Sequence, residues 1–156
     1  MKGDKKVIGH LNRILTNELT AINQYFLHAK MHANRGYHKL AERVRKESVD
    51  EMKHADRLME RILFLDGLPN LQNHGKLFIG QTPKEALECD LKLEHQALPD
   101  LKAGIVDCEK LGDFVSRKLL TDILESEEEH VDWLETQLAL MERLGEQNYL
   151  QAKMSS

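Results

Sequence analysis

The chain has 156 residues, with 26 acidic against 22 basic side chains and a net charge of −4 at neutral pH. This length suits one domain with a sizeable core, so we expect residues 1–156 to form a single domain. The mild negative charge gives no sign of a nucleic-acid partner, which would favour a basic surface. Neither a signal peptide nor an apolar run long enough to span a bilayer is visible, so we expect a cytoplasmic protein without a membrane partner.

The spacing of apolar residues by three and four predicts helices throughout the chain. The first is expected over residues 5–34 and the second over residues 38–66, where Gly67 and Pro69 would end it. A connection over residues 67–82 follows. Because it is long for a compact domain, we expect it to cross from one end of a helical bundle to the other.

The third helix has a clear predicted start at a capping box. Thr82 can cap the helix, Pro83 suits its first turn and Glu85 completes the box. This helix should run to about residue 112, with a kink at Pro99, because proline cannot donate a backbone hydrogen bond. A fourth helix over residues 113–145 and a short fifth over residues 147–154 complete an all-α fold. Four such long helices need mutual packing, which favours a four-helix bundle.

The two cysteines, Cys89 and Cys108, are expected to be free thiols. They lie 19 residues apart on one predicted helix. At a rise of about 1.5 Å per residue they would be roughly 28 Å apart, too far for a disulfide between them.

Each of the four long helices carries one glutamate inside or beside its apolar stripe. Glu18, for example, is four residues from both Ile14 and Ile22 on the same helix face. Burying an ionised carboxylate is costly unless a cation compensates its charge. The four glutamates are Glu18, Glu51, Glu94 and Glu127.

Two of these glutamates have a histidine three residues later, in the pairs Glu51 with His54 and Glu127 with His130. Residues three apart share a helix face, so each pair can point into the bundle. One glutamate from each of two helices and Glu-x-x-His from each of the other two is the ligand set of di-iron carboxylate bundles.

The spacing of the glutamates repeats between the two halves of the chain. Glu18 and Glu51 are 33 residues apart, as are Glu94 and Glu127. Two equivalent helical hairpins would bring four carboxylates and two imidazoles around one centre, where two divalent ions would balance the four negative charges. Mixed oxygen and nitrogen donors favour Fe, Mn or Co, although zinc could also occupy such a site.

The other acidic residues and histidines are expected to be solvated or packed, not metal ligands, because a single Glu-x-x-His pair or a lone acid is usually solvated. We expect a solvated face at Glu125, Glu128 and Glu129, and surface or packing histidines at His10, His28, His32, His38, His74 and His95.

Several segments together carry a resemblance over essentially the whole chain. They are residues 1–4, Asn17-Glu18-Leu19, residues 21–28, Asp50-Glu51-Met52-Lys53-His54-Ala55-Asp56, residues 61–65, residues 67–71, residues 122–127 and Asn148-Tyr149-Leu150-Gln151. In these segments the sequence resembles the bacterioferritin family. The resemblance implies a ferritin-like four-helix bundle with a long crossover between its second and third helices.

The resemblance also implies iron storage and detoxification by a ferroxidase. Glu51 and Glu127 would bridge two iron ions, Glu18 with His54 would complete one, and Glu94 with His130 the other. Fe(II) would be oxidised with peroxide or oxygen, and ferric mineral would be deposited inside a shell of 24 subunits. The shell would contain this chain alone or a second subunit type as well.

Haem b is a further cofactor that the resemblance implies. It would lie between two paired subunits, each of which would supply Met52 as an axial ligand to the haem iron. A small ferredoxin would donate the electrons that reduce and release stored iron.

Two further site residues follow from the resemblance. Tyr25, near the centre, could supply an electron during oxidation, although a purely structural tyrosine is an equal alternative. Asp50 would belong to an accessory iron site on the inner surface of the shell. Lys46 stands where many members have the histidine of that site, and protonated lysine cannot act as a ligand. As a hypothesis, Arg45 or Lys46 could instead pair with the haem propionates.

The sequence leaves two alternatives to a ferroxidase that stores iron. The first is a di-iron peroxidase of the rubrerythrin type that stores no iron, although the chain has no Cys-x-x-Cys tail. The second is a helical structural module that binds no metal.

Overall fold

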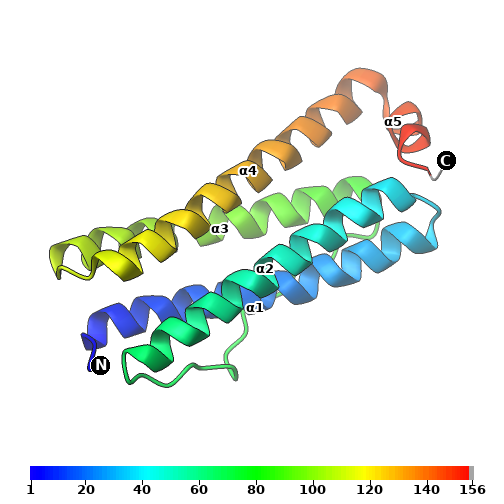
Figure 1. The fold of residues 1–156 in the computed structure, drawn as a ribbon. Coiled ribbons are helices and arrows are strands. Elements are labelled where there is room, and N and C mark those ends of the chain that lie inside the picture. Colours follow the sequence, from blue (N-terminus) through cyan, green and yellow to red (C-terminus); the bar gives the residue numbers. More distant parts are fainter. Residues whose placement is uncertain (155–156) are drawn as a thin grey trace.

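The structure, a computed structural model, describes residues 1–154 and is all-helical in its regular elements. Its five helices are α1 (Lys5–Asn34), α2 (His38–Phe64), α3 (Pro83–Lys110), α4 (Phe114–Leu144) and α5 (Glu146–Ala152). The helices α1 and α2 form one antiparallel hairpin, α3 and α4 form another, and α5 lies across one end (Figure 1). The predicted four-helix bundle with a crossover and a short fifth helix is therefore confirmed. Within residues 1–154, none of the helices combines the length and the apolar character that crossing a bilayer requires.

The second helix ends two residues before its predicted end. Asp66 has a left-handed backbone conformation, with φ of 62°, and the Gly67 N–H donates to the Ile62 carbonyl at 2.9 Å. A left-handed residue just after a helix directs the chain away from the helix axis and satisfies its last carbonyls. The apolar pattern continues through Leu65, so spacing alone placed the end too late.

The start of α3 agrees with the predicted capping box. The Thr82 hydroxyl accepts a hydrogen bond from the Glu85 N–H at 3.1 Å, and Pro83 is the first helical residue. The Glu85 carboxylate accepts from the Gln81 N–H at 3.1 Å, one residue before the cap. Pro99 lies inside α3, which continues through it to Lys110.

The core consists of two apolar clusters along the bundle axis. One contains Leu11, Leu58, Leu101 and Leu120, and the other contains Tyr25, Val44, Leu87, Leu134 and Tyr149. Each fully buried aliphatic side chain contributes about 1.5–3 kcal/mol to folding. On every long helix, the stripe glutamate lies between the residues of these two clusters. The clusters therefore support a polar layer in the middle of the bundle.

The crossover over residues 67–82 connects opposite ends of the bundle (Figure 1). Its backbone N–H groups donate to three side chains that lie four residues apart along one stripe of α1. The pairs are Gly75 with Thr20 at 2.7 Å, Phe78 with Gln24 at 2.8 Å, and Gly80 with His28 at 3.0 Å. These three bonds attach the extended segment directly to α1.

Gly80→Ala is expected to destabilise the fold because the crossover lies against the backbone of α3 there. An added Cβ would lie 2.2 Å from the Ala86 nitrogen and 2.5 Å from the Glu85 carbonyl carbon, which cannot turn aside as a side chain can. Overpacking of this kind costs about 1–3 kcal/mol. Thermal unfolding followed by circular dichroism should show a midpoint several degrees lower.

Gly9→Ala is the matched control, because no atom lies within 4 Å of a Cβ added at Gly9. Alanine is favoured over glycine inside a helix by about 1 kcal/mol, so this variant should be neutral or more stable. Equal unfolding midpoints for the two variants would contradict the close approach at Gly80.

The cysteines Cys89 and Cys108 are both free, as the helical spacing predicts. Cys108 is buried in the first apolar cluster, and Cys89 is half-buried. Burial raises the pKa of the Cys108 thiol to about 11, which keeps it in the unreactive thiol form.

Candidate metal centre

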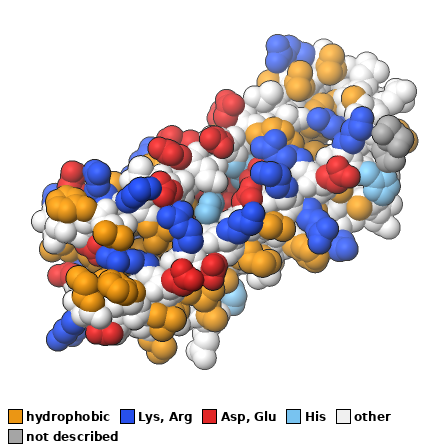
Figure 2. Space-filling model, in the orientation of Figure 1, with side chains coloured by type: hydrophobic (Ala, Val, Ile, Leu, Met, Phe, Trp, Pro, Cys, Tyr) orange, Lys and Arg blue, Asp and Glu red, His pale blue; other side chains and the backbone are white. Residues whose placement is uncertain are grey.

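Six side chains from all four long helices meet in the polar layer between the two apolar clusters. Five of them are buried, and the His54 side chain is 12% exposed. Figure 2 shows histidine and acidic side chains reaching the surface near the middle of the face that α2 and α4 form. The six residues are Glu18 on α1, Glu51 and His54 on α2, Glu94 on α3, and Glu127 and His130 on α4.

These six residues form two overlapping groups that could each hold a metal ion. Within each group, one ligand atom per residue lies within 4.8 Å of the others. Glu51 and Glu127 belong to both groups, so their carboxylates lie between the two potential metal positions. The first group adds Glu18 and His54, and the second adds Glu94 and His130. The structure thus brings together all six residues that the sequence singles out.

Four polar atoms of this centre are buried without any hydrogen-bond partner. They are Glu18 Oε2, His54 Nδ1, Glu94 Oε2 and Glu127 Oε1. The closest approaches of His54 Nδ1 to carboxylate oxygens are 3.3 Å to Glu127 and 3.5 Å to Glu18, longer than ordinary N–H···O bonds. Each buried unsatisfied group costs about 1–3 kcal/mol. A pair of cations would satisfy these oxygen and nitrogen atoms, so the donor set fits two metal ions.

The crowding of carboxylates changes their affinity for protons. Burial and the neighbouring Glu51 raise the pKa of Glu127 to about 8, and burial raises the pKa of Glu94 well above its usual range. Burial disfavours the charged form of His54, but the Glu127 and Glu51 carboxylates outweigh this and raise its pKa to about 10. Without a metal the centre therefore favours bound protons, which divalent cations would replace.

Tyr25 lies directly beside the second ligand group. Its hydroxyl donates to the Glu94 carboxylate, and its ring lies edge-on to His130 with centroids 5.0 Å apart. Burial and the nearby Glu94 carboxylate raise the pKa of the Tyr25 hydroxyl well above its ordinary value. This contact holds the Glu94 carboxylate in position. The supply of an electron by Tyr25 stays a prediction.

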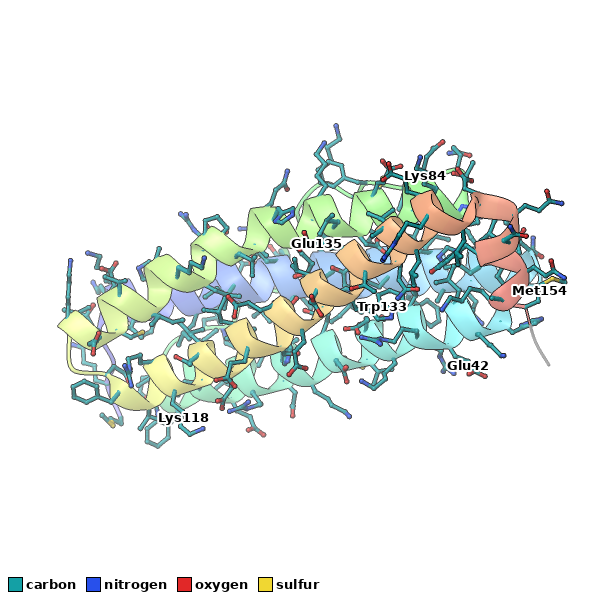
Figure 3. The ribbon with its side chains drawn as sticks, turned by 90° about the horizontal axis from the view of Figure 1, so that it is seen from above. Glu42, Lys84, Lys118, Trp133, Glu135 and Met154 are labelled. Atoms are coloured by element: carbon teal, nitrogen blue, oxygen red, sulfur yellow. The ribbon has the colours of Figure 1, made fainter. Side chains whose placement is uncertain are left out.

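A second layer of contacts supports His130 from α2 and α4. Trp133, labelled in Figure 3, stacks on His130 at 6.4 Å, and the Arg43 guanidinium lies 4.5 Å from the Trp133 ring. Arg43 also pairs with Glu47 at 2.9 Å, and Glu47 lies 3.8 Å from His130. The position of Glu47 beside the centre was not predicted, although Glu47 lies one helical turn before Glu51 and so shares its face of α2.

Met52 lies on the outside of α2, 54% exposed, while the adjacent Glu51 is buried. The two side chains therefore face different directions, as adjacent residues about 100° apart around a helix do. Phe26 and Val49 are large exposed apolar residues as well. Asp50 lies outside both ligand groups and pairs with Lys46 at 3.0 Å. An accessory iron site at Asp50 stays a prediction, and this ion pair competes with it.

A buried polar cluster beside the centre was not predicted from the sequence. Gln24 and His28 both donate to Asp90, at 2.9 Å and 2.7 Å, and all three side chains are buried. Gln24 and His28 also hold the crossover. The predicted solvated face is confirmed, since Glu125, Glu128 and Glu129 are exposed. His28, expected to be a surface or packing histidine, packs inside the bundle.

Comparisons with a family model and with individual proteins agree with each other. A family model described as a ferritin-like domain matches residues 8–144. The chain is 55% identical to the bacterioferritin of Mycobacterium leprae over 149 residues, which cover 96% of this chain and 94% of that protein. It is 50% identical to the bacterioferritin of Brucella melitensis and 48% identical to that of Rhodobacter capsulatus, each over 96% of this chain and 92% of the relative. With the six-residue centre in place on this fold, the chain belongs to the bacterioferritin family.

Proposed function

We propose that this chain stores and detoxifies iron by oxidising Fe(II) at the six-residue centre and depositing ferric mineral inside a shell of 24 subunits. The observation that carries this proposal is the pair of overlapping ligand groups, buried across four helices, with unsatisfied oxygen and nitrogen atoms. Residues 1–156 act as one domain in this proposal. The chain forms the shell alone or together with a second subunit type.

The six residues have distinct roles in the proposed reaction. Glu51 and Glu127 bridge two iron ions because both residues belong to both groups. Glu18 with His54, and Glu94 with His130, complete the two coordination sets. Four carboxylates balance the charge of two divalent ions, so Fe(II) can be held in a buried site. Iron held there is oxidised to Fe(III) by peroxide or oxygen, with Tyr25 as the candidate source of an additional electron.

Haem b is the second proposed cofactor, held between two subunits by Met52 from each. A thioether is a known axial ligand of haem iron, and the exposed Met52 is free to reach a group outside its own subunit. Val49, three residues before Met52 on α2, is also exposed and offers apolar surface for the macrocycle. Haem b would supply electron-transfer chemistry there, and a small ferredoxin would be the electron donor for iron release. Arg45 stays a hypothetical partner of the haem propionates, since Lys46 is paired with Asp50.

The test is an iron titration of the assembled, metal-free protein. Fe(II) is added without oxygen, peroxide follows, and near-ultraviolet absorbance is recorded against iron per subunit. A fast phase that saturates at about two irons per subunit is expected, one for each ligand group. Continued slower uptake at higher loading would identify storage.

Two other outcomes would favour the alternatives. Fast oxidation without any further uptake or mineral would support a non-storing peroxidase of the rubrerythrin type. Absence of a fast phase would remove the di-iron centre and leave a structural helical bundle.

A further inference from the structure

Two successive side chains of α1 connect the crossover to α3 in the same way. Gln24 Nε2 donates to Asp90 Oδ1 at 2.9 Å, while Gln24 Oε1 accepts from the Phe78 N–H at 2.8 Å. One helical turn later, His28 Nδ1 lies 2.7 Å from the same Asp90 oxygen, and His28 Nε2 accepts from the Gly80 N–H at 3.0 Å. We call these two connections the Gln24 bridge and the His28 bridge. Each joins a buried carboxylate of α3 to the backbone of the crossover.

The two partners of His28 determine where its imidazole carries a proton. A backbone N–H can only donate, so the Gly80 amide requires an unprotonated Nε2. The Asp90 carboxylate accepts, so the single ring proton of neutral His28 lies on Nδ1. A second proton could be added only at Nε2, where it would point at the proton of the Gly80 amide. The His28 bridge therefore exists only with a neutral imidazole, whereas the side-chain amide of the Gln24 bridge has no comparable titration.

The charged and titratable groups around His28 come from α1 and α3. Asp90 on α3 is buried with His28 and would pair with its protonated form, so burial alone does not prevent protonation. His32, one turn further along α1, has its ring centroid 6.5 Å from that of His28. Burial, with His28 and Arg35 nearby, lowers the pKa of His32 to about 4, so His32 stays neutral under mildly acidic conditions. The crossover presents the backbone of Gly80 to His28.

We propose that the His28 bridge is a pH-sensitive attachment of the crossover, closed while the imidazole is neutral and opened when Nε2 takes up a proton. The inference goes beyond the proposed function, because it concerns a cluster outside the six-residue centre. The detached state can bind one more proton than the attached state, so attachment is favoured at high pH and weakens as the pH falls. Histidine side chains change charge between about pH 5 and pH 8, which is the interval to examine.

The position of the His28 bridge gives its opening a structural consequence. His28 belongs to the α1–α2 hairpin and Asp90 to the α3–α4 hairpin, and the crossover is the chain connection between these hairpins. Asp90 also lies one helical turn before Glu94, a residue of the metal centre, on α3. Acid would therefore loosen the segment that connects the hairpins, while the Gln24 bridge keeps α1 and α3 together.

The experiment measures amide hydrogen exchange of the assembled, metal-free protein by mass spectrometry at about pH 8 and about pH 5. Each rate is divided by the intrinsic rate of an unfolded chain at the same pH, so that only protection by structure is compared. The fragment that contains the Gly80 amide is expected to lose protection about threefold to tenfold at the lower pH, the effect of one hydrogen bond. The fragment that contains Gly75 should keep its protection, because the Gly75 N–H donates to the hydroxyl of Thr20, which does not titrate.

His28→Gln is the most informative variant, because glutamine can form the same bridge without titrating. Its amide can donate to Asp90 and accept from Gly80, as Gln24 does with Asp90 and Phe78. The Gly80 fragment of this variant should therefore stay protected at both pH values.

His10→Gln is the matched control on the same helix. His10 also pairs with an aspartate of α3, since its Nε2 lies 2.7 Å from Asp107. Within residues 1–154, however, His10 forms no hydrogen bond with the crossover. The His10→Gln variant should therefore show the wild-type response of the Gly80 fragment to pH.

Equal protection of the Gly80 fragment at the two pH values in the wild type would overturn the inference. A pH response that persists in His28→Gln would also overturn it, because another group, such as Glu127 with its pKa of about 8, would then be responsible. Loss of protection at Gly75 as well, or loss of the response in His10→Gln, would indicate a general opening and count against the bridge. A His28→Gln variant unprotected at both pH values, beside a responding wild type, would support the inference, since it resembles the acid form. None of these outcomes depends on metal binding, so the proposed function is tested separately.

Discussion

Glu127→Ala is expected to slow the fast oxidation of Fe(II) about 100-fold or more. Glu127 is one of two residues common to both ligand groups, so its loss leaves each potential metal position with three residues. Changing even an outer partner of a metal ligand costs about 10–100-fold, and the loss of a bridging carboxylate should cost at least as much. The measurement is the initial rate of near-ultraviolet absorbance increase when peroxide is added to the Fe(II)-loaded protein.

Glu128→Ala is the matched control, because Glu128 is the adjacent residue of α4 and is exposed. It removes the same carboxyl group from the same helix without touching the centre, so this variant should oxidise Fe(II) at the wild-type rate. Retention of the fast phase in Glu127→Ala would contradict the assignment of the bridging ligand. Equal losses in the two variants would indicate a general effect of charge on iron uptake.

The same pair of variants should differ in metal-linked stability. A ligand that binds only the folded state stabilises it by about 2.7 kcal/mol at a hundred times its Kd. For a chain of this size that corresponds to a rise of roughly 5–11 °C in the unfolding midpoint. Wild type and Glu128→Ala should show this rise with Co(II), whereas Glu127→Ala should lose most of it.

Met52→Leu is expected to remove haem b from the protein. Leucine has nearly the same volume as methionine but no sulfur, so the proposed axial ligand is lost on both sides of the shared haem. Because Met52 is 54% exposed, the substitution should leave folding unchanged. The measurement is Soret absorbance per protein, with a loss of most of the wild-type signal expected while the fast oxidation of Fe(II) persists.

Met154→Leu is the appropriate control, since Met154 is 49% exposed but lies at the end of the chain beyond α5 (Figure 3). It should retain the full haem content. Normal haem binding in Met52→Leu would refute the assignment of Met52. Equal losses in both variants would point to a general effect of methionine substitution on haem incorporation or assembly.

The sequence by itself determined the helices and the candidate ligands of the centre. Apolar spacing specified which face of each helix is buried, and a glutamate such as Glu18 stood out because a carboxylate in an apolar stripe contradicts that pattern. Repeated Glu-x-x-His pairs at equal spacing then identified a ligand set. These signals are local or depend only on distance along the chain, so they can be recognised in the sequence without knowledge of the tertiary structure.

The tertiary structure alone decided how the helices align with one another and where the crossover runs. Periodicity gives a face but not the register between helices, so the contact of Gln24 with Asp90, 66 residues later, carried no sequence signal. The crossover has no periodicity, and its attachment at Thr20 depends on backbone N–H groups that every residue except proline carries. A cavity of about 60 Å³ beside the centre arises from both features, because its lining combines the four glutamates of the long helices with Gly75 and Lys76 of the crossover.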